Sequence, residues 1–470
     1  MRLRVARNTF FLLAGQVLDK ATSYLFLIYI TRFFGSEFFG TYVTAVTFVA
    51  MAGNLVDFGL YNLVVRDLAQ DRSRVREYLG KVLPLRAGLA IAAISLIQVA
   101  ARLFGYPPEV AVLSGIASLS LLIGVPGGLL IAGINALEHI HISALCSIAG
   151  NVLTTLFSIL ALHYGMGLRG VFLGWLAAGV ISFVLVSAGA KQVGVGMSPR
   201  IDWPCLRQTV HDALPFATLT LALMALGTDV LILSRWHGAA AAGLYSAARR
   251  PLEILLFIPA SFMGALYPVV AAQYTASKEL VWQTYQESLH VLICLAMPLA
   301  IGVTILRERI VVSLYGSTFL PAAAAVPYLA FALAVAFLNA PATNLIFSAR
   351  KTAEFVPYFV GNMVGCVLLN LLLIPSFGYV GASVATLITI LAGFFVQRHF
   401  MGLIFGRRPA FVSLSTRPLL AAGLMAVALR LFWSLSTILL VGIACVAYGV
   451  ALWALGGLRR QDFALSRGSG

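Results

Sequence analysis

Long apolar stretches, separated by short polar segments, run through almost the whole chain of 470 residues. A helix that crosses a bilayer needs about 20 mainly apolar residues, because each residue advances it by about 1.5 Å. By this criterion the pattern predicts fourteen membrane-spanning helices with short connections, the longest being 191–212. The predicted spans are residues 9–34, 41–62, 82–103, 110–134, 142–162, 171–190, 213–234, 241–270, 285–306, 322–346, 356–374, 382–404, 417–434 and 436–456.

The composition agrees with this pattern. Hydrophobic residues make up 60% of the chain, charged residues only 10%, and the mean hydropathy is +0.95. Soluble domains contain about 45–50% apolar and roughly 25% charged residues. The polar surface is therefore too small to cover a soluble protein of this length, and the chain is expected to be an all-α polytopic membrane protein.

The distribution of basic residues predicts the orientation in the membrane. The chain has 32 Lys and Arg against 17 Asp and Glu, in short clusters between the apolar runs. Such dispersed clusters are typical of the positive-inside rule and argue against nucleic-acid binding. With a cytoplasmic N-terminus, 22 of the 32 basic residues, Arg66 and Arg86 among them, fall in cytoplasmic segments and 7 on the opposite side. Both termini are therefore expected in the cytoplasm.

The N-terminal sequence MRLRVARN resembles the charged start of a signal peptide, but the apolar run after it has no small-x-small cleavage site. It is expected to be a retained first helix. The five cysteines are scattered and form no C-x-x-C motif, so they indicate neither a disulfide framework nor a zinc site. Glu138, His139 and His141 are interpreted as a solvated loop.

Two motifs occur twice in the sequence. The pattern R-x2-G-x4-G-x-Y-x2-A begins at Arg32 and again at Arg235, 203 positions later. The pattern G-N-x15-G-x2-G begins at Gly150 and again at Gly361, 211 positions later. Six spans are an even number, so both copies enter the membrane in the same direction and form a parallel repeat. The predicted parts are a six-helix bundle 1–190, a cytoplasmic linker 191–212, a second six-helix bundle 213–404, and two additional helices with a cytoplasmic tail 405–470.

Several charged residues fall inside predicted spans, where each costs about 2.5–3.5 kcal/mol on insertion scales. Such residues are expected to pair with each other or to serve transport. The first span contains Asp19 and Lys20, the second Asp57, the seventh Asp229, and the eighth Arg249, Arg250 and Glu253.

The cluster in the eighth span has a defined helical geometry. Tyr245, Arg249 and Glu253 follow each other at intervals of four and share one helix face, so Glu253 can neutralise Arg249. Arg250 points about 100° away, and it is predicted to lack a partner in its own helix.

Spans 1 and 8 belong to different copies of the repeat, and both can face a cleft between the bundles. Arg249, Arg250 and Lys20 would attract an anion to such a cleft, most naturally a phosphate. The alternative is that these charges pair with one another and only hold helices together. Asp57 and Arg66, near the inner end, are gate or topology candidates, and Asp229 is expected close enough to the outer face to reach water.

Catalytic motifs are missing from the sequence. There is no G-x4-G-K-[ST] phosphate loop and no G-x-S-x-G nucleophile elbow, so the chain is not expected to be an enzyme or to hydrolyse nucleotide. No cofactor or metal is expected. Transport would draw on an ion gradient, the membrane potential or the substrate gradient.

Several stretches carry a family resemblance, among them NTFFLLAGQVLDK at 8–20, DFGLYNLVVRDLA at 57–69 and the segments 39–48, 227–271, 315–319 and 348–387. They resemble the polysaccharide-transporter family (Wzx-type flippases) of the MOP exporter superfamily. This resemblance implies a flippase that moves undecaprenyl-diphosphate-linked oligosaccharides from the cytoplasmic to the periplasmic leaflet of the bacterial inner membrane by alternating access. The product would serve O-antigen, capsule or exopolysaccharide assembly, with a polysaccharide polymerase and a chain-length regulator as partners.

The resemblance also implies roles for the charged residues. Arg249 and Arg250, beside Tyr245, would contact the diphosphate or acidic sugars, and Lys20 would support them. Asp19 and Glu253 would couple transport to protons or sodium ions, and Asp57, Asp229 and Arg66 are further coupling or gating candidates.

Other functions remain open at this stage. Lipid II flippases of the same superfamily share fourteen spans. Multidrug and toxin extruders usually have twelve and prefer cations, which an arginine-rich cavity disfavours. A membrane polymerase or ligase typically has a large periplasmic loop, whereas the outer loops here are short.

Overall fold

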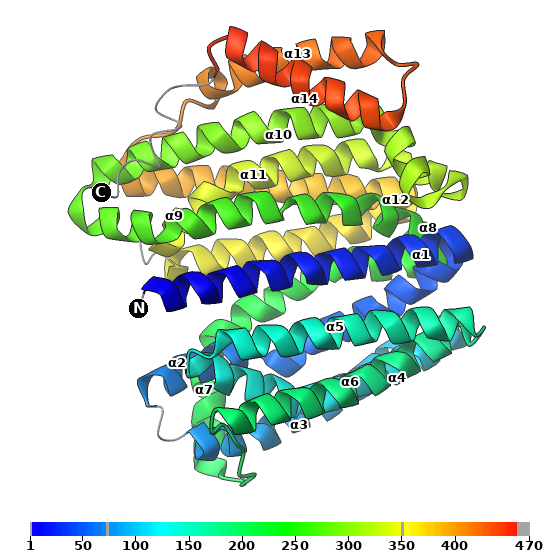
Figure 1. The fold of residues 1–470 in the computed structure, drawn as a ribbon, viewed down its shortest axis with the longest axis vertical. Coiled ribbons are helices and arrows are strands. Elements are labelled where there is room, and N and C mark those ends of the chain that lie inside the picture. Colours follow the sequence, from blue (N-terminus) through cyan, green and yellow to red (C-terminus); the bar gives the residue numbers. More distant parts are fainter. Residues whose placement is uncertain (1, 72–74, 349–351, 458–470) are drawn as a thin grey trace. The chain divides into compact units, whose positions relative to one another are not determined.

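The computed structural model describes residues 2–71, 75–348 and 352–457, without the side chains of residues 2–19, 69, 70, 219, 268, 275, 276, 352 and 353. These residues form helices with short connections and no strand, which confirms the all-α fold (Figure 1). The α-helices are α1 (Arg2–Asp57), α2 (Leu60–Gln70), α3 (Val75–Leu103), α4 (Pro108–Ala136), α5 (Ile140–His163), α6 (Gly167–Gln192), α7 (Trp203–Ala222), α8 (Thr228–Leu255), α9 (Phe257–Ala276), α10 (Lys278–Tyr315), α11 (Val326–Ser348), α12 (Thr352–Phe405), α13 (Phe411–Leu431) and α14 (Thr437–Ala454). Two 3₁₀ helices, η2 (Leu223–Gly227) and η3 (Ser317–Ala324), precede α8 and α11.

Eleven helical stretches among the described residues are long and apolar enough to cross a membrane. Three of them are much longer than one crossing requires. Lys20–Leu68 has 49 residues, Thr220–Tyr267 has 48 and Glu354–Phe405 has 52. Because about 20 residues suffice for one crossing, each of the three can cross twice. The total of fourteen crossings stays a prediction.

A glycine with positive φ interrupts each of these three stretches. Gly35 in α1, Gly238 in α8 and Gly378 in α12 have φ values of 78°, 84° and 54°. Residues with a Cβ atom rarely adopt this conformation. Gly35 and Gly238 are matching positions of the sequence repeat, and their ψ values of −176° and 172° are also alike. The chain therefore turns in the same way in both copies.

Packing divides the chain into two compact units, Met1–Gly243 and Leu244–Gly470. Unit 1 contains α1 to α7 and the first part of α8, and one of its apolar cores joins α2, α3, α4 and α6 through side chains such as Val64, Leu79 and Leu129. The helix α8 continues into unit 2. The predicted boundaries near residues 190 and 213 describe where the two copies of the repeat end and begin, which is a different division from that into packed units. They stay a prediction.

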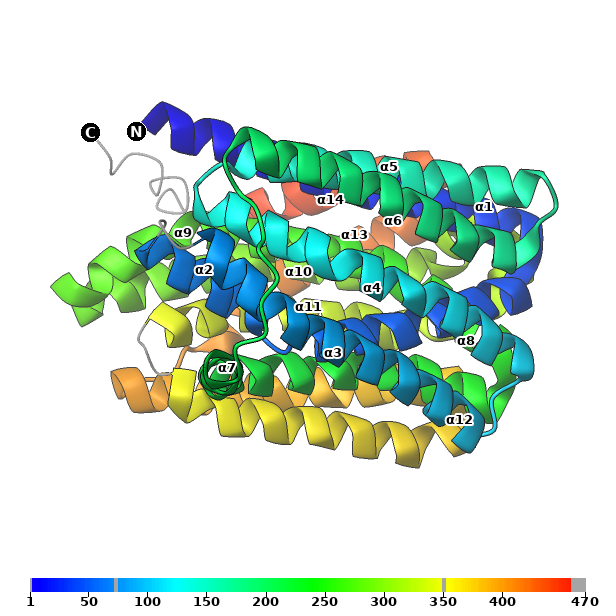
Figure 2. The ribbon, with the colours of Figure 1, turned by 90° about the horizontal axis from the view of Figure 1, so that it is seen from below.

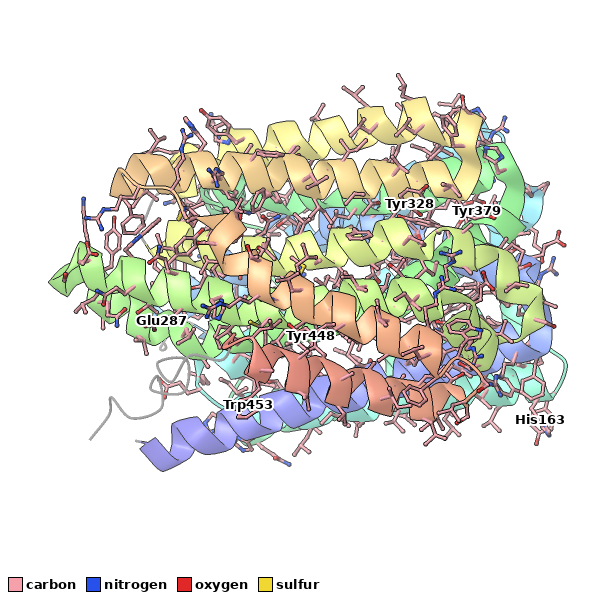
Figure 3. All side chains as sticks on the ribbon, turned by 90° about the horizontal axis from the view of Figure 1, so that it is seen from above. His163, Glu287, Tyr328, Tyr379, Tyr448 and Trp453 are labelled. Carbon is pink, nitrogen blue, oxygen red and sulfur yellow. The ribbon has the colours of Figure 1, made fainter. Side chains whose placement is uncertain are left out.

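Unit 2 contains the rest of α8 and the helices α9 to α14. One of its cores joins α9, α10, α11, α12 and the start of α13, and another places α13 and α14 against α10. The hydroxyl of Tyr448 in α14, which is labelled in Figure 3, donates a hydrogen bond of 2.7 Å to the carbonyl oxygen of Cys294 in α10. The guanidinium of Arg309 donates another, of 2.6 Å, to the carbonyl oxygen of Leu435.

A tyrosine contact is repeated in the two units. In unit 1 the rings of Tyr42 and Trp175 lie 6.1 Å apart, and in unit 2 the oxygens of Tyr245 and Thr386 lie 3.2 Å apart. Tyr245 follows Tyr42 by 203 positions and Thr386 follows Trp175 by 211, the two offsets of the repeat. The duplication seen in the sequence thus corresponds to equivalent helix packing.

The matching segments of the two sequence copies also pack against each other within unit 1, and we call this packing the glycine contact. Ser36 and Gly40 of α1 pack against Ala239 and Gly243 of α8. A Cβ atom at Gly40 would overlap the backbone oxygen of Ala239, and one at Gly243 would overlap that of Ser36. Ala239 corresponds to Ser36 and Gly243 to Gly40 in the repeat. Gly40 thus meets Ala239 in the same way as Gly243 meets Ser36, so the contact is reciprocal. Small residues permit this close backbone approach.

Helix α7 has a different direction from its neighbours in unit 1. It is seen end-on in Figure 2, where α3, α4, α5 and α6 lie lengthwise. Hydropathy alone predicts a continuous seventh span over 213–234, but α7 ends at Ala222 and the 3₁₀ helix η2 separates it from α8. The reason is that hydropathy averages over the turn and cannot reveal a change of helix direction.

Candidate functional site

The charged cluster of α8 forms a compact ion-pair network in unit 2. The Nε of Arg249 lies 2.6 Å from the Oε1 of Glu253, one helical turn away. The guanidinium of Arg249 also lies 5.8 Å from the centre of the Tyr245 ring, which is fully buried. Tyr245, Arg249 and Glu253 thus lie along one helix face, as their spacing predicts.

The prediction that Arg250 lacks a partner in its own helix is wrong. Its Nη1 lies 3.7 Å from the Oε2 of Glu253. The physical reason is that residues three apart on a helix are neighbours as well as residues four apart. Glu253 therefore serves both arginines, and the three side chains together carry one net positive charge. The Arg250 side chain is 47% exposed and that of Arg249 only 21%.

The helix is interrupted directly after this cluster. The predicted eighth span, 241–270, is divided into α8 and α9 at Leu256. Pro251 and Pro259 lie on either side of the break, and because proline has no N–H group, each leaves a carbonyl one turn earlier without its helical partner. Interrupted helices in membrane proteins occur where the backbone lines a cavity or is otherwise buried in protein.

Unit 1 has a similar interruption in its second span. Helix α1 ends at Asp57 and α2 begins at Leu60, and Phe58 and Gly59 between them have φ values of 44° and 73°. A positive φ in an aromatic residue is uncommon and indicates local strain. Phe216 of α7 packs so closely on Gly59 that a Cβ atom there would overlap it.

A buried ion pair lies at this interruption. The Nη2 of Arg86 in α3 is 3.0 Å from the Oδ1 of Asp57. The Arg86 side chain is 10% exposed and that of Asp57 is 28% exposed. Arg86 is therefore buried among the helices and neutralised by Asp57, and its cytoplasmic side stays a prediction. The Nε and Nη1 of Arg86 have no hydrogen-bond partner.

The other candidates are dispersed. Lys20 is exposed on α1 in unit 1, and the side chain of Asp19 lies outside the described residues. Arg66 in α2 pairs with the adjacent Asp67 at 2.9 Å. Asp229, expected within reach of water, is only 4% exposed and accepts a hydrogen bond of 2.7 Å from the N–H of Val230. No group of three His, Cys, Asp or Glu in the described part of the chain could hold a metal ion.

Unit 2 also contains a group of partly buried amides that the sequence pattern does not indicate. Asn339 of α11 donates to the carbonyl oxygen of Ile390, and Gln397 of α12 donates to the Oγ1 of Thr343. The Thr343 hydroxyl itself donates to the carbonyl oxygen of Asn339, so it can only accept from Gln397. Both amides are thus fixed in orientation, and their oxygens have no donor. A spacing rule cannot detect this group, because its members come from two helices.

Comparison with known proteins gives several similarities. The chain is 22% identical over 408 residues to "Probable flippase AglR" of Haloferax volcanii, which covers 83% of this chain and 82% of that protein. It is 23% identical over 360 residues to "Succinoglycan biosynthesis transport protein ExoT" of Rhizobium meliloti, with 75% of this chain and 68% of that protein covered. Its structure is similar to that of "Lipid II flippase MurJ" in an inward closed conformation, with a TM-score of 0.75, 14% identity, and 95% of this chain and 98% of that chain covered.

Together, the helical fold and the ion pairs at the interrupted spans define a polytopic membrane protein with the fold of the MOP exporter superfamily. Residues 5–273, more than half of the chain, match the family described as "Polysaccharide biosynthesis protein". The chain belongs to this family, in agreement with the resemblance in the sequence.

Proposed function

We propose that the protein is a flippase for undecaprenyl-diphosphate-linked oligosaccharides, which it moves from the cytoplasmic to the periplasmic leaflet. The observation that carries this proposal is the cluster of Arg249, Arg250 and Glu253 just before the α8–α9 break. Two guanidinium groups lie here beside one carboxylate. A diphosphate can accept charge-assisted hydrogen bonds from such a pair of guanidinium groups. The family and the names of the relatives support this substrate class.

The two arginines have different roles in this proposal. Arg250 is the more exposed and the more weakly paired, so it binds the diphosphate directly. A guanidinium can hold two phosphate oxygens at once, which an ammonium group cannot do with the same geometry. Arg249 is held by Glu253 and by the ring of Tyr245, and it supplies positive charge next to the phosphate. Lys20 is the supporting cation of unit 1.

Glu253 couples substrate binding to a cation in this mechanism. Its carboxylate and the diphosphate compete for the same guanidinium groups. A proton, or a sodium ion, that neutralises Glu253 frees the arginines and so strengthens diphosphate binding, and linkage requires the converse as well. Asp19, Asp57, Asp229 and Arg66 are further coupling or gating residues. Alternation between inward-open and outward-open states then moves the bound headgroup across the membrane.

Deletion of the gene from its host tests this function. We expect loss of the surface polymer and accumulation of lipid-diphosphate repeat units on the cytoplasmic leaflet. Plasmid-borne wild-type protein should restore the polymer. Extraction and mass spectrometry of the accumulated lipid identify the polyprenol, the diphosphate and the sugars. Accessibility of the repeat units to a sugar-specific probe in right-side-out and inside-out vesicles shows the leaflet.

Other outcomes would contradict the proposal in recognisable ways. Normal polymer together with sensitivity to cationic drugs would indicate a multidrug transporter. Accumulation of lipid II with normal surface polymer would indicate peptidoglycan precursor transport. Unpolymerised single repeat units on the cell surface would indicate a polymerase instead.

A further inference from the structure

Helix α7 is too polar to be one of the apolar spans, although it has 20 residues. One side of it is buried in unit 1 and includes Leu206, Ala213 and Ala217. The opposite side is exposed and includes Trp203, Arg207, His211 and Leu214. Together with its crosswise direction (Figure 2), this two-sided pattern is typical of a helix that lies along a membrane surface.

Large apolar side chains are exposed next to basic ones at the start of α7. Ile201 is 68% exposed and Trp203 is 75% exposed, and they lie between Arg200 and Arg207 in the sequence. We call these four residues the α7 anchor. Two of them, Trp203 and Arg207, line an open hollow of about 670 Å³ together with Pro204, Gln208, His211 and Asp212. Tryptophan and arginine together favour the headgroup region, where an apolar ring and a phosphate are both within reach.

The charges around the anchor favour an anionic ligand. The carboxylate of Asp202 accepts from Lys81 at 3.0 Å and from the N–H of Cys205 at 3.2 Å, and Asp212 lies 3.4 Å from His211. Asp202 is therefore paired. In contrast, three exposed cations of this region have no acidic partner among the described side chains, namely Arg76, Arg200 and Arg207.

We propose that the α7 anchor binds an anionic phospholipid of the cytoplasmic leaflet. Arg200 and Arg207 contact the headgroup phosphate, and Ile201 and Trp203 enter the boundary between headgroups and acyl chains. The two exposed apolar side chains favour a bilayer lipid over a free phosphate ion, which would leave them in water. Anionic surfaces attract nearby basic residues by about fivefold in binding constant for each Lys or Arg.

The buried side of α7 connects this lipid contact to the interrupted second span. Phe216 packs on Gly59, and Ala213 packs with Leu60 and Leu63 of α2. A lipid that fixes α7 therefore also fixes the break between α1 and α2, where Asp57 and Arg86 pair. The inference concerns binding and does not depend on the proposed substrate.

Fluorescence quenching by brominated lipids tests the proposal. The full-length protein is reconstituted in phosphatidylcholine vesicles that contain an equal fraction of either dibromo-phosphatidylglycerol or dibromo-phosphatidylcholine. The signal of Trp203 is the difference between wild type and Trp203→Phe. We expect this signal to be quenched more strongly by the brominated phosphatidylglycerol. High salt should weaken the preference, because it screens the charges.

Arginine variants then test whether the α7 anchor causes the preference for phosphatidylglycerol. Arg200→Ala and Arg207→Ala should each reduce the lipid preference at Trp203 about fivefold. Arg102→Ala removes an exposed cation at the far end of α3 and should leave the preference unchanged. Because all three side chains are exposed, the variants are expected to fold, and size-exclusion chromatography verifies this.

Three results would overturn the proposal. Equal quenching by both lipids would mean that the anchor inserts without recognising a headgroup. No quenching at Trp203 would mean that it does not lie on a membrane. Loss of the preference on addition of millimolar inorganic phosphate would indicate a site for soluble anions.

Discussion

At the scale of single residues, Arg250 combines high exposure with weak pairing. Its neighbour Arg249 is held at 2.6 Å by Glu253, whereas Arg250 approaches the same carboxylate only to 3.7 Å. The weaker pair is the easier one to exchange for a phosphate. The two adjacent arginines are therefore not equivalent, although they have the same charge.

Arg250→Ala is expected to abolish polysaccharide export while membrane insertion stays intact. Arg250→Lys should retain part of the activity, because the charge remains but the two-oxygen geometry is lost. Surface polymer, measured together with the amount of protein in the membrane, checks both variants. Normal export by Arg250→Ala at wild-type protein levels would show that this residue does not bind the substrate.

The pair of Asp57 and Arg86 is expected to matter for stability. Loss of one partner leaves the other charge buried, which costs about 2–4 kcal/mol of stability. Asp57→Asn should destabilise the protein more than Arg86→Met, because the charge that it leaves unpaired, on Arg86, is the more buried one. The double variant should be less destabilised than the sum of the two. Thermal unfolding followed by size-exclusion chromatography in detergent measures all three, and additive losses would exclude a direct pair.

Spacing alone predicts the contact of Arg249 with Glu253, because both lie on one helix. The partner of Arg86 could not be predicted in the same way. Asp57 lies 29 residues earlier and on a different helix, so only the packing of α1 on α3 brings them together. The contact of Arg250 with Glu253 also follows from spacing, because residues three apart on a helix are neighbours as well as residues four apart.

At the scale of helices, the junction of α1 and α2 depends on a glycine. An alanine at Gly59 would combine a left-handed conformation with an overlap at Phe216. Gly59→Ala is therefore expected to destabilise the protein by about 2–5 kcal/mol. Gly88→Ala is the control, since Gly88 lies in helix α3 with open space around it, and it should be neutral or stabilising. Equal thermal midpoints for both variants would contradict this structure of the junction.

The start of α7 depends on Asp202. The ammonium of Lys81 and the N–H of Cys205 hold the pKa of Asp202 below its ordinary value of 3.8. A lowered pKa means that the carboxylate stabilises the folded state above the ordinary pKa, and that this contribution is lost as the pH falls below about 4. In wild type, hydrogen exchange in the first turn of α7 should therefore increase at acidic pH, after correction for the intrinsic rate.

Asp202→Ala should show the faster exchange already at neutral pH and no further acid-dependent increase. Asp212→Ala provides the comparison, because Asp212 lies inside the helix and caps nothing. Unchanged exchange in Asp202→Ala would mean that other contacts hold the start of α7.

At the scale of the whole molecule, the apolar runs predict the all-α membrane fold, and the two repeated motifs predict a parallel repeat. Gly35 and Gly238, which occupy matching positions of the repeat, have nearly the same backbone angles. Hydropathy could not predict the interruptions at Phe58 and Leu256 or the crosswise helix α7. It measures how apolar a segment is, whereas these features depend on backbone geometry and on packing.

Substitutions at the glycine contact test the repeat at this scale. Gly40→Ala and Gly243→Ala should lower the thermal midpoint by similar amounts, because each Cβ atom meets the equivalent backbone oxygen. Gly423→Ala, in a helix with open space around it, should have little effect. A large loss for one glycine and none for its counterpart would show that the contact is not reciprocal.

The reciprocal contact has a consequence for how such a protein can diversify. Two identical subunits could form the same reciprocal contact as a dimer, but every charged residue would then be present in both subunits. A duplicated and fused gene can retain the contact and alter each copy separately elsewhere. Val46 and Thr47 stand at the positions that match Arg249 and Arg250, so the arginine pair exists in one copy only. Fusion of the copies thus permits an asymmetric distribution of charge on a symmetric scaffold.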